Sequence, residues 1–259
     1  MNTKTEVAVK ENTAVAQPGS WKERLKGYAK QSVAIADEAG GGGNFLSFKA
    51  GQITYKGAAV AGNKLDVIIL EAVLEYADYV GDFDSDNPQP PICYAFGRTE
   101  EEMKPHPKAP QPQHDKCIGC PQNEFGSAEK GRGKHCKNIM RLAIIPAKPL
   151  DADTIKKSEA AYIRIPVMSV GNYASYAKKL SALHELPPFA VVTQLGTVPD
   201  AKSQFRVTFE DVEHIEDEAI MDLLVAQHEA QVESIMFPYS VATVTEKEEK
   251  PAPKTKKKF

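Results

Sequence analysis

The chain lacks a long hydrophobic run. No stretch of about 18 consecutive apolar residues, the least that a transmembrane helix requires, occurs anywhere in its 259 residues. Residues 1–6 also lack the apolar stretch of a secretory signal peptide. We therefore expect a cytoplasmic protein that has no membrane partner.

Cysteine is scarce, and where it occurs it is clustered. The chain contains four cysteines: Cys93, Cys117, Cys120 and Cys136. A reducing cytosol disfavours structural disulfides, so clustered cysteines there more often bind metal or carry out redox chemistry. Cys117 and Cys120 are separated by two residues, a spacing that lets two thiolates face one cation. We predict a structural Zn²⁺ held by all four cysteines, with His114 or His135 as alternatives to Cys93.

Catalytic signatures are also missing. No paired acid and base and no Ser/His/Asp cluster stands out, and four thiolates would leave zinc no open coordination position. A thioredoxin-type redox motif would need a strand-to-helix junction, which neither flank of Cys117–Cys120 suggests. We therefore expect a binding protein and not an enzyme.

Charge of one sign is absent from two segments. Residues 130–148 contain six basic residues and no acidic one, whereas residues 207–237 contain nine acidic residues and no Lys or Arg. Net charge is only −3, so the overall balance conceals this separation. The pattern favours a basic groove on an otherwise acidic body.

The hydrophobic pattern predicts a mainly β fold with flanking helices, of the α+β class. The strand-like segments are residues 45–48, 52–55, 65–79, 140–145, 161–167, 189–195 and 205–212, and the helical ones are 20–36, 169–183 and 217–236. Residues 65–79 also fit a helix, because Glu71 and Glu75 would share one face, but the β-branched cluster at its start favours a long strand. This order fits a small OB-like barrel of about five strands with a helix between the third and fourth. We expect one domain over residues 20–240, interrupted by a zinc loop at 93–137, between disordered segments at 1–19 and 241–259.

The zinc loop is also the predicted nucleic-acid contact. Residues 125–136 are rich in glycine and basic side chains, which suit phosphate oxygens, although a solvated charged loop is the alternative. The predicted phosphate contacts are Lys130, Arg132, Lys134, Lys137 and Arg141. The aromatic residues predicted to stack on unpaired bases are Phe48, Tyr55 and Tyr76, with Phe45 and Tyr79 nearby, although burial in the core competes with this role for each ring.

Several short motifs resemble a bacteriophage family. They are Pro90-Pro91-Ile92-Cys93, Gln113, Cys117-Ile118-Gly119-Cys120-Pro121, Gly126-Ser127, Cys136, Arg141-Leu142-Ala143, Tyr173 to Leu180 and Pro187-Pro188-Phe189 to Thr193. The family consists of phage single-stranded DNA-binding proteins with an OB-type barrel interrupted by a zinc loop. The resemblance covers residues 40–236 and implies zinc ligation by the four cysteines. A phage-encoded chain would act in the host cytoplasm.

The end of the chain departs from that family. Many such binders end in an acidic tail with a terminal aromatic residue that recruits partners. Here Phe259 follows Lys256-Lys257-Lys258, so the tail itself could contact phosphate.

These observations lead to one expected function and two competitors. We expect a protein that coats single-stranded DNA during replication or recombination, with little sequence preference and with replication proteins as further partners. The alternative is a zinc-stabilised protein–protein adaptor of a phage replication or transcription complex, which uses the acidic helix at residues 217–236. A hydrolase is the least supported class.

Overall fold

The computed structural model describes residues 25–29, 44–55, 58–81 and 89–239. The chain divides into two compact units, Met1–Gly42 and Gly43–Phe259. In the first unit, residues 25–29 form a short helical segment within the predicted helix 20–36. The predicted disordered segments 1–19 and 241–259 lie outside the described residues. No helix in the described part is long and apolar enough to cross a membrane.

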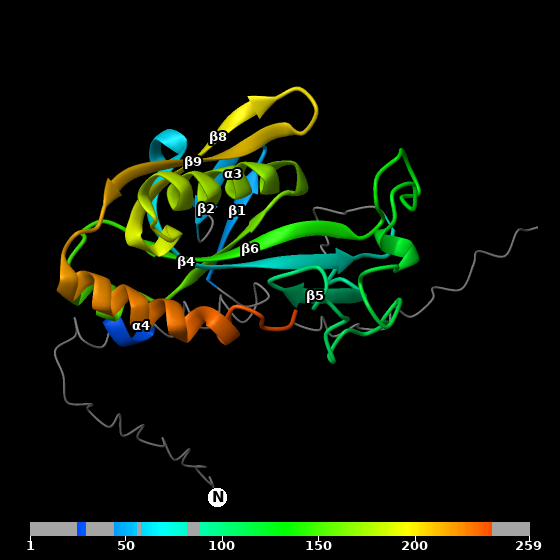
Figure 1. The fold of residues 1–259 in the computed structure, drawn as a ribbon, viewed down its shortest axis with the longest axis horizontal. Helices are drawn as coiled ribbons and strands as arrows, with labels where there is room; N and C mark the ends of the chain where they lie inside the picture. Colours follow the sequence, from blue (N-terminus) through cyan, green and yellow to red (C-terminus); the bar gives the residue numbers. More distant parts are fainter. Residues whose placement is uncertain (1–24, 30–43, 56–57, 82–88, 240–259) are drawn as a thin grey trace, which may run out of the picture. The chain divides into compact units, whose positions relative to one another are not determined.

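The second unit is mainly β with a few helices (Figure 1). Its strands are β1 (Phe45–Lys49), β2 (Gln52–Tyr55), β3 (Ala58–Ala59), β4 (Lys64–Asp78), β5 (Cys93–Gly97), β6 (Lys137–Pro146), β7 (Ala161–Ile165), β8 (Val191–Asp200) and β9 (Gln204–His214). Its α-helices are α2 (Ala152–Lys157), α3 (Val167–His184) and α4 (Glu218–Ser234), and its 3₁₀ turns are η1 (Ala61–Asn63), η2 (Pro121–Asn123) and η3 (Pro188–Ala190).

All nine strands belong to one mixed sheet that curls into a half-barrel. The order is β3-β2-β1-β7-β6-β4-β8-β9, with β5 added beside β4. Every pair is antiparallel except β1 with β7. The two ends of this order approach each other, because Thr197 of β8 donates a hydrogen bond to the carbonyl of Gly51 (2.5 Å) and Phe48 packs on Phe205.

The long strand β4 is the centre of the sheet. Its β-branched run Val67-Ile68-Ile69 favours an extended backbone, and successive side chains point to opposite faces. Val67 and Ile69 therefore enter the core inside the curl, whereas Ile68 and Leu70 enter a second core on the outer face. A register shift against β6 between Ile69 and Glu71 adds a bulge, which increases the local twist.

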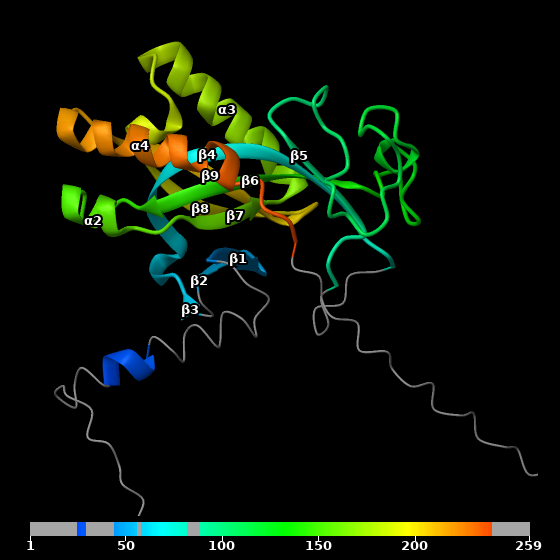
Figure 2. The same cartoon turned by 90° about the horizontal axis from the view of Figure 1, so that it is seen from below.

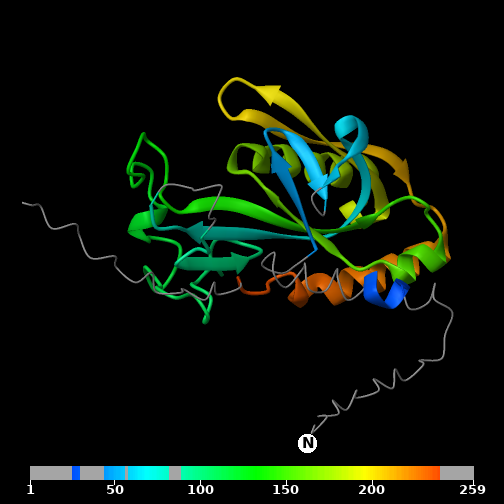
Figure 3. The same cartoon turned by 180° about the vertical axis from the view of Figure 1, so that it is seen from behind.

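Helices cover both faces of the sheet. Helix α3 contributes Tyr173, Tyr176 and Leu180 to the inner core. Helices α2 and α4 cover the outer face, where Ile155, Ile220 and Leu224 are buried. Figure 3 shows α4 and α2 on the side of β4 and β6 that faces away from α3. The curled sheet thus lies between two hydrophobic layers.

The predicted mainly β class is confirmed, as are the long strand in 65–79 and the helix between the strands at 161–167 and 189–195. Three strands or helices were missed: β3, β5 and α2. Leu183, near the end of α3, is 65% exposed and does not join Tyr173, Tyr176 and Leu180 in the inner core. The helix predicted from residue 169 begins two residues earlier, at Val167, so Ser169 lies inside its first turn. The buried Ser169 hydroxyl accepts a hydrogen bond from the backbone N–H of Val207.

A buried ion-pair network joins the outer face of the sheet to the segment after α4. Glu75 of β4 is fully buried and accepts hydrogen bonds from Arg141 Nε at 2.6 Å, from Arg164 Nε at 2.9 Å and from the hydroxyl of Tyr239. Arg141 also donates to the carbonyls of Ile235 and Phe237. Burial acts to raise the pKa of Glu75, but the charges of Arg164 and Arg141 outweigh it and lower the pKa below its ordinary value of 4.5.

We predict that Glu75→Gln lowers the free energy of unfolding by about 3–5 kcal/mol, because the buried guanidinium of Arg141 and the half-buried guanidinium of Arg164 lose their counter-charge. Since the folded-state pKa of Glu75 is depressed, its contribution is complete above pH 4.5 and is lost as pH falls through the lower folded value. Urea unfolding between neutral and acid pH measures both effects. Glu229→Gln, on the exposed side of α4, is the matched control, and equal stability of the two variants would contradict the prediction.

Candidate metal centre and basic loop

The segment between β4 and β6 begins and ends inside the sheet. Ala77 near the end of β4 pairs with Lys137 at the start of β6, and β5 pairs with the same part of β4. Figure 2 shows this segment extending beyond the ends of β4 and β6, away from α2 and the start of α4. Both ends of the long loop are therefore fixed by strand pairing, close to each other.

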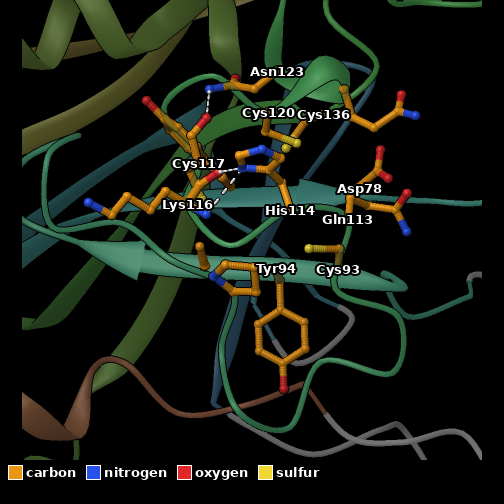
Figure 4. A pocket seen from close by; sticks show the side chains of 14 residues that line it. Asp78, Cys93, Tyr94, Gln113, His114, Lys116, Cys117, Cys120, Asn123 and Cys136 are labelled. Carbon is orange, nitrogen blue, oxygen red and sulfur yellow. Dashed lines mark hydrogen bonds between the residues drawn. The ribbon is translucent and has the colours of Figure 1, made fainter.

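The loop encloses a small cavity that all four cysteines line. Cys93 projects from the start of β5, Cys117 and Cys120 come from the loop, and Cys136 directly precedes β6 (Figure 4). The cavity volume is about 20 Å³, enough for one occupant of the size of a water molecule or an ion. None of the four is in a disulfide. Cysteines 43 residues apart in sequence, from 93 to 136, thus line one cavity.

A tight turn sets the direction of Cys117 and Cys120. The Cys120 N–H lies 3.4 Å from the Cys117 carbonyl, and the Asn123 side chain donates to the same carbonyl at 3.0 Å. Between them, Gly119 has a φ of +76°, which glycine adopts without a Cβ clash. The Cys117 N–H donates to the carbonyl of Met103, a fully buried residue, so the turn is anchored to the interior.

The thiols influence one another electrostatically. Burial raises the pKa of Cys117 to about 12, and the nearby Cys93 and Cys120 act in the same direction. Burial also raises the pKa of Cys136 to about 12, with further contributions from Asp78 and the other three cysteines. In the absence of a cation these groups stay protonated at neutral pH. A cation that binds them would have to displace protons.

The three candidates for a fourth ligand are not equivalent. Cys93 and His114 both line the cavity. His114 Nδ1, however, lies 3.0 Å from the Lys116 carbonyl, on an exposed side chain. His135 Nδ1 is paired with Asp78. The ring contacts of both histidines therefore favour Cys93.

The four cysteine sulfur atoms do not form a compact group. Within the described residues, the group of three or more possible ligand atoms that all lie within 4.8 Å of one another is His184, Asp211 and His214, which does not involve the cysteines. The cysteine cavity has the donor set that zinc prefers, and its thiols would have to approach one another to reach a tetrahedral arrangement.

Four of the five predicted phosphate contacts lie on or beside the loop surface. Lys130, Arg132 and Lys137 are exposed, and Lys134 is half-buried, with its Nζ 3.2 Å from Asn123 Oδ1. Arg141 is different: it is fully buried and paired with Glu75. The prediction that Arg141 contacts phosphate is therefore wrong, because its guanidinium group is already used inside the fold.

The predicted base-stacking rings are mostly occupied by the core. Tyr76 is 3% exposed and donates a hydrogen bond to Glu100, so it has no face free for a base and this prediction is wrong. Phe48 and Tyr55 are half-buried against the inner core. Their assignment as base contacts stays a prediction.

Sequence reasoning overlooked the most exposed aromatic ring among the exposed hydrophobic residues. Phe125 is 82% exposed, and Lys134 Nζ lies 5.1 Å from its ring centroid. Both belong to the part of the loop where the N–H groups of Gly126 and Ala128 donate to the Gly133 carbonyl. The sequence signal that could have identified Phe125 was its position as an aromatic residue within the basic, glycine-rich segment.

Comparison of the chain with models of protein families, with curated proteins and with solved structures finds no match. The function must therefore be argued from the fold and the loop themselves.

If the cysteines bind zinc, protein purified under reducing conditions should carry about one Zn²⁺ per chain, released when the thiols are modified. Elemental analysis with a colorimetric zinc assay measures this. Cys117→Ser, Cys120→Ser, Cys136→Ser and Cys93→Ser should each reduce the zinc content, whereas His114→Ala and His135→Ala should retain it. Full zinc in Cys93→Ser together with loss in a histidine variant would exclude the four-cysteine set.

Proposed function

We propose that this protein binds single-stranded DNA with little sequence preference, through the loop between β4 and β6 of an OB-type barrel. The loop is held in shape by a structural Zn²⁺ on Cys93, Cys117, Cys120 and Cys136. The protein acts as a non-enzymatic coat on unpaired strands during replication or recombination. The argument rests on strand connectivity and on one surface feature of the loop.

The strand connectivity supports an OB-type barrel. Taken in chain order, β4, β6, β7, β8 and β9 form the antiparallel pairs first–second, second–third, first–fourth and fourth–fifth. Helix α3 connects the third and fourth of these strands. This order matches that of a five-stranded OB barrel, with one exception. The fifth strand would close an OB barrel by pairing with the third, whereas here β1 lies parallel to the third strand, β7.

The likeness to an OB barrel also suggests that the loop between β4 and β6 binds the nucleic acid. In OB folds, oligonucleotides bind over the second and third strands and the loop between the first and second. Here that loop is the segment with the four cysteines and the basic residues. The outer side of β6 and β7 is less accessible, because Phe237 packs on Tyr162 and the Arg141 guanidinium lies 4.3 Å from the Phe237 ring centroid. We therefore propose that the loop, and not the outer side of β6 and β7, is the main contact for DNA.

The observation that carries the proposal is the contact of an exposed aromatic ring with a lysine in the basic part of the loop. Phe125 exposes 82% of its surface, and Lys134 lies against its ring. The exposed ring and the neighbouring ammonium group together offer a stacking face and a positive charge to another molecule. A flat aromatic face stacks on any base, and lysine and arginine neutralise any phosphate. Such a combination recognises a single strand without reading its sequence.

A Zn²⁺ in the cavity would give the loop a defined shape. Long segments with little regular structure are uncommon in compact domains unless something else orders them. A Zn²⁺ on four thiolates would join β5, the turn at Cys117–Cys120 and the start of β6. The basic residues between Cys120 and Cys136 would then be tethered at both ends.

We expect Phe125→Ala to weaken binding to oligo-dT by about 1–3 kcal/mol, because one stacked base is lost. Lys134→Ala and Arg132→Ala should each lower the salt dependence, the slope of log K against log salt, by about 0.7. Fluorescence anisotropy over a range of salt concentrations measures both quantities.

Two variants control for general surface effects. Leu183→Ala removes an exposed apolar side chain from α3, and Lys157→Ala removes an exposed charge from α2; neither should change the affinity. Absence of binding to oligo-dT at low salt, or equal affinity of Phe125→Ala and wild type, would refute the proposal. Tighter binding to duplex DNA than to the single strand would also contradict it.

A further inference from the structure

A second cluster of metal-binding side chains lies far along the chain from the cysteine loop. His184 is the last residue of α3. Asp211 and His214 lie near the end of β9, and His214 is its last residue. One ligand atom from each residue lies within 4.8 Å of the other two. The imidazole rings of His184 and His214 have centroids 4.4 Å apart at an angle of 70°. Asp211 and His214 are half-buried and His184 is exposed.

A β-bulge brings Asp211 and His214 to the same face. Residues three apart on a regular strand point to opposite sides of a sheet. Here Thr193 pairs with Asp211, Val192 with Glu213 and Val191 with His214, so Val212 is an extra residue. Thr193 and Val191 are two residues apart on β8 and share one face, so their partners Asp211 and His214 also share one face. Bulges often redirect a side chain beside a functional site in this way.

We propose that His184, Asp211 and His214 form a second, surface metal site for a divalent transition cation such as Zn²⁺, Co²⁺ or Ni²⁺. Two imidazoles and one carboxylate suit metals of intermediate softness. Three protein ligands leave at least one coordination position for water or for a donor from another molecule. This site is therefore open, in contrast to a four-cysteine site.

The surrounding charges favour a cation. His184 lies at the C-terminal, partially negative end of the α3 dipole. Residues 207–237 carry nine acidic side chains and no Lys or Arg. One group opposes the ion: Lys179, five residues before His184 on α3, donates to Asp211 Oδ1 at 2.8 Å. A metal ion must compete with this lysine for the carboxylate.

Because Lys179 competes with the metal ion, removing a ligand and removing Lys179 should change the Ni²⁺ affinity in opposite directions. Calorimetric titration of the full-length protein with Ni²⁺ should show a binding event that disappears in His184→Ala and in His214→Ala. Asp211→Asn should weaken it by about tenfold or more, since one of three ligands is lost. Lys179→Ala should instead tighten it by about two- to fivefold, the equivalent of one exposed ion pair.

Neighbouring residues supply the controls. Glu213→Gln removes an acidic charge from the opposite face of the same strand, and Lys178→Ala removes an exposed lysine from the same helix; both should bind Ni²⁺ like wild type. The event should persist in Cys117→Ser, which separates it from the cysteine cavity. Ni²⁺ binding that survives loss of either imidazole, or that is absent from the wild type, overturns the proposal.

Discussion

A single buried carboxylate holds the second unit together. Glu75 lies on β4, between β5 and β6, and is fully buried. An isolated charge in such a place is very costly, so its partners must be present whenever the fold is. Those partners come from β6, from β7 and from the segment beyond α4. Residues separated by 164 positions, from Glu75 to Tyr239, are thereby committed to one arrangement.

Much of the framework could be predicted from the sequence, because it follows from local patterns. The β-branched run at Val67-Ile68-Ile69 indicated a long strand, which is β4, and the spacing of Tyr173, Tyr176 and Leu180 indicated a helix, which is α3. The two-residue spacing of Cys117 and Cys120, followed by Cys136, indicated that these thiols share one cavity. In each case the residues that carry the signal are close in the chain.

The rest could not be predicted, because it depends on partners distant in sequence. Arg141 is the last arginine of a basic run and looks the same as its neighbours until Glu75 is found beside it. Tyr76 alternates like a surface residue, but the cysteine loop covers it. Helix α2 has six residues, too few for a clear helical period. The meeting of His184 with His214 requires both a helix end and a bulge, and neither leaves a reliable mark on composition.

The attachment of the cysteine loop has a consequence for how this fold can diversify. The loop leaves and rejoins the sheet at adjacent, hydrogen-bonded strand ends, where Ala77 pairs with Lys137. Insertions or deletions inside it would leave the register of β4 against β6 unchanged, and added length costs little closure entropy. The scaffold and its appendage can therefore evolve at different rates. New binding preferences could arise through the appendage while the curled sheet stays the same.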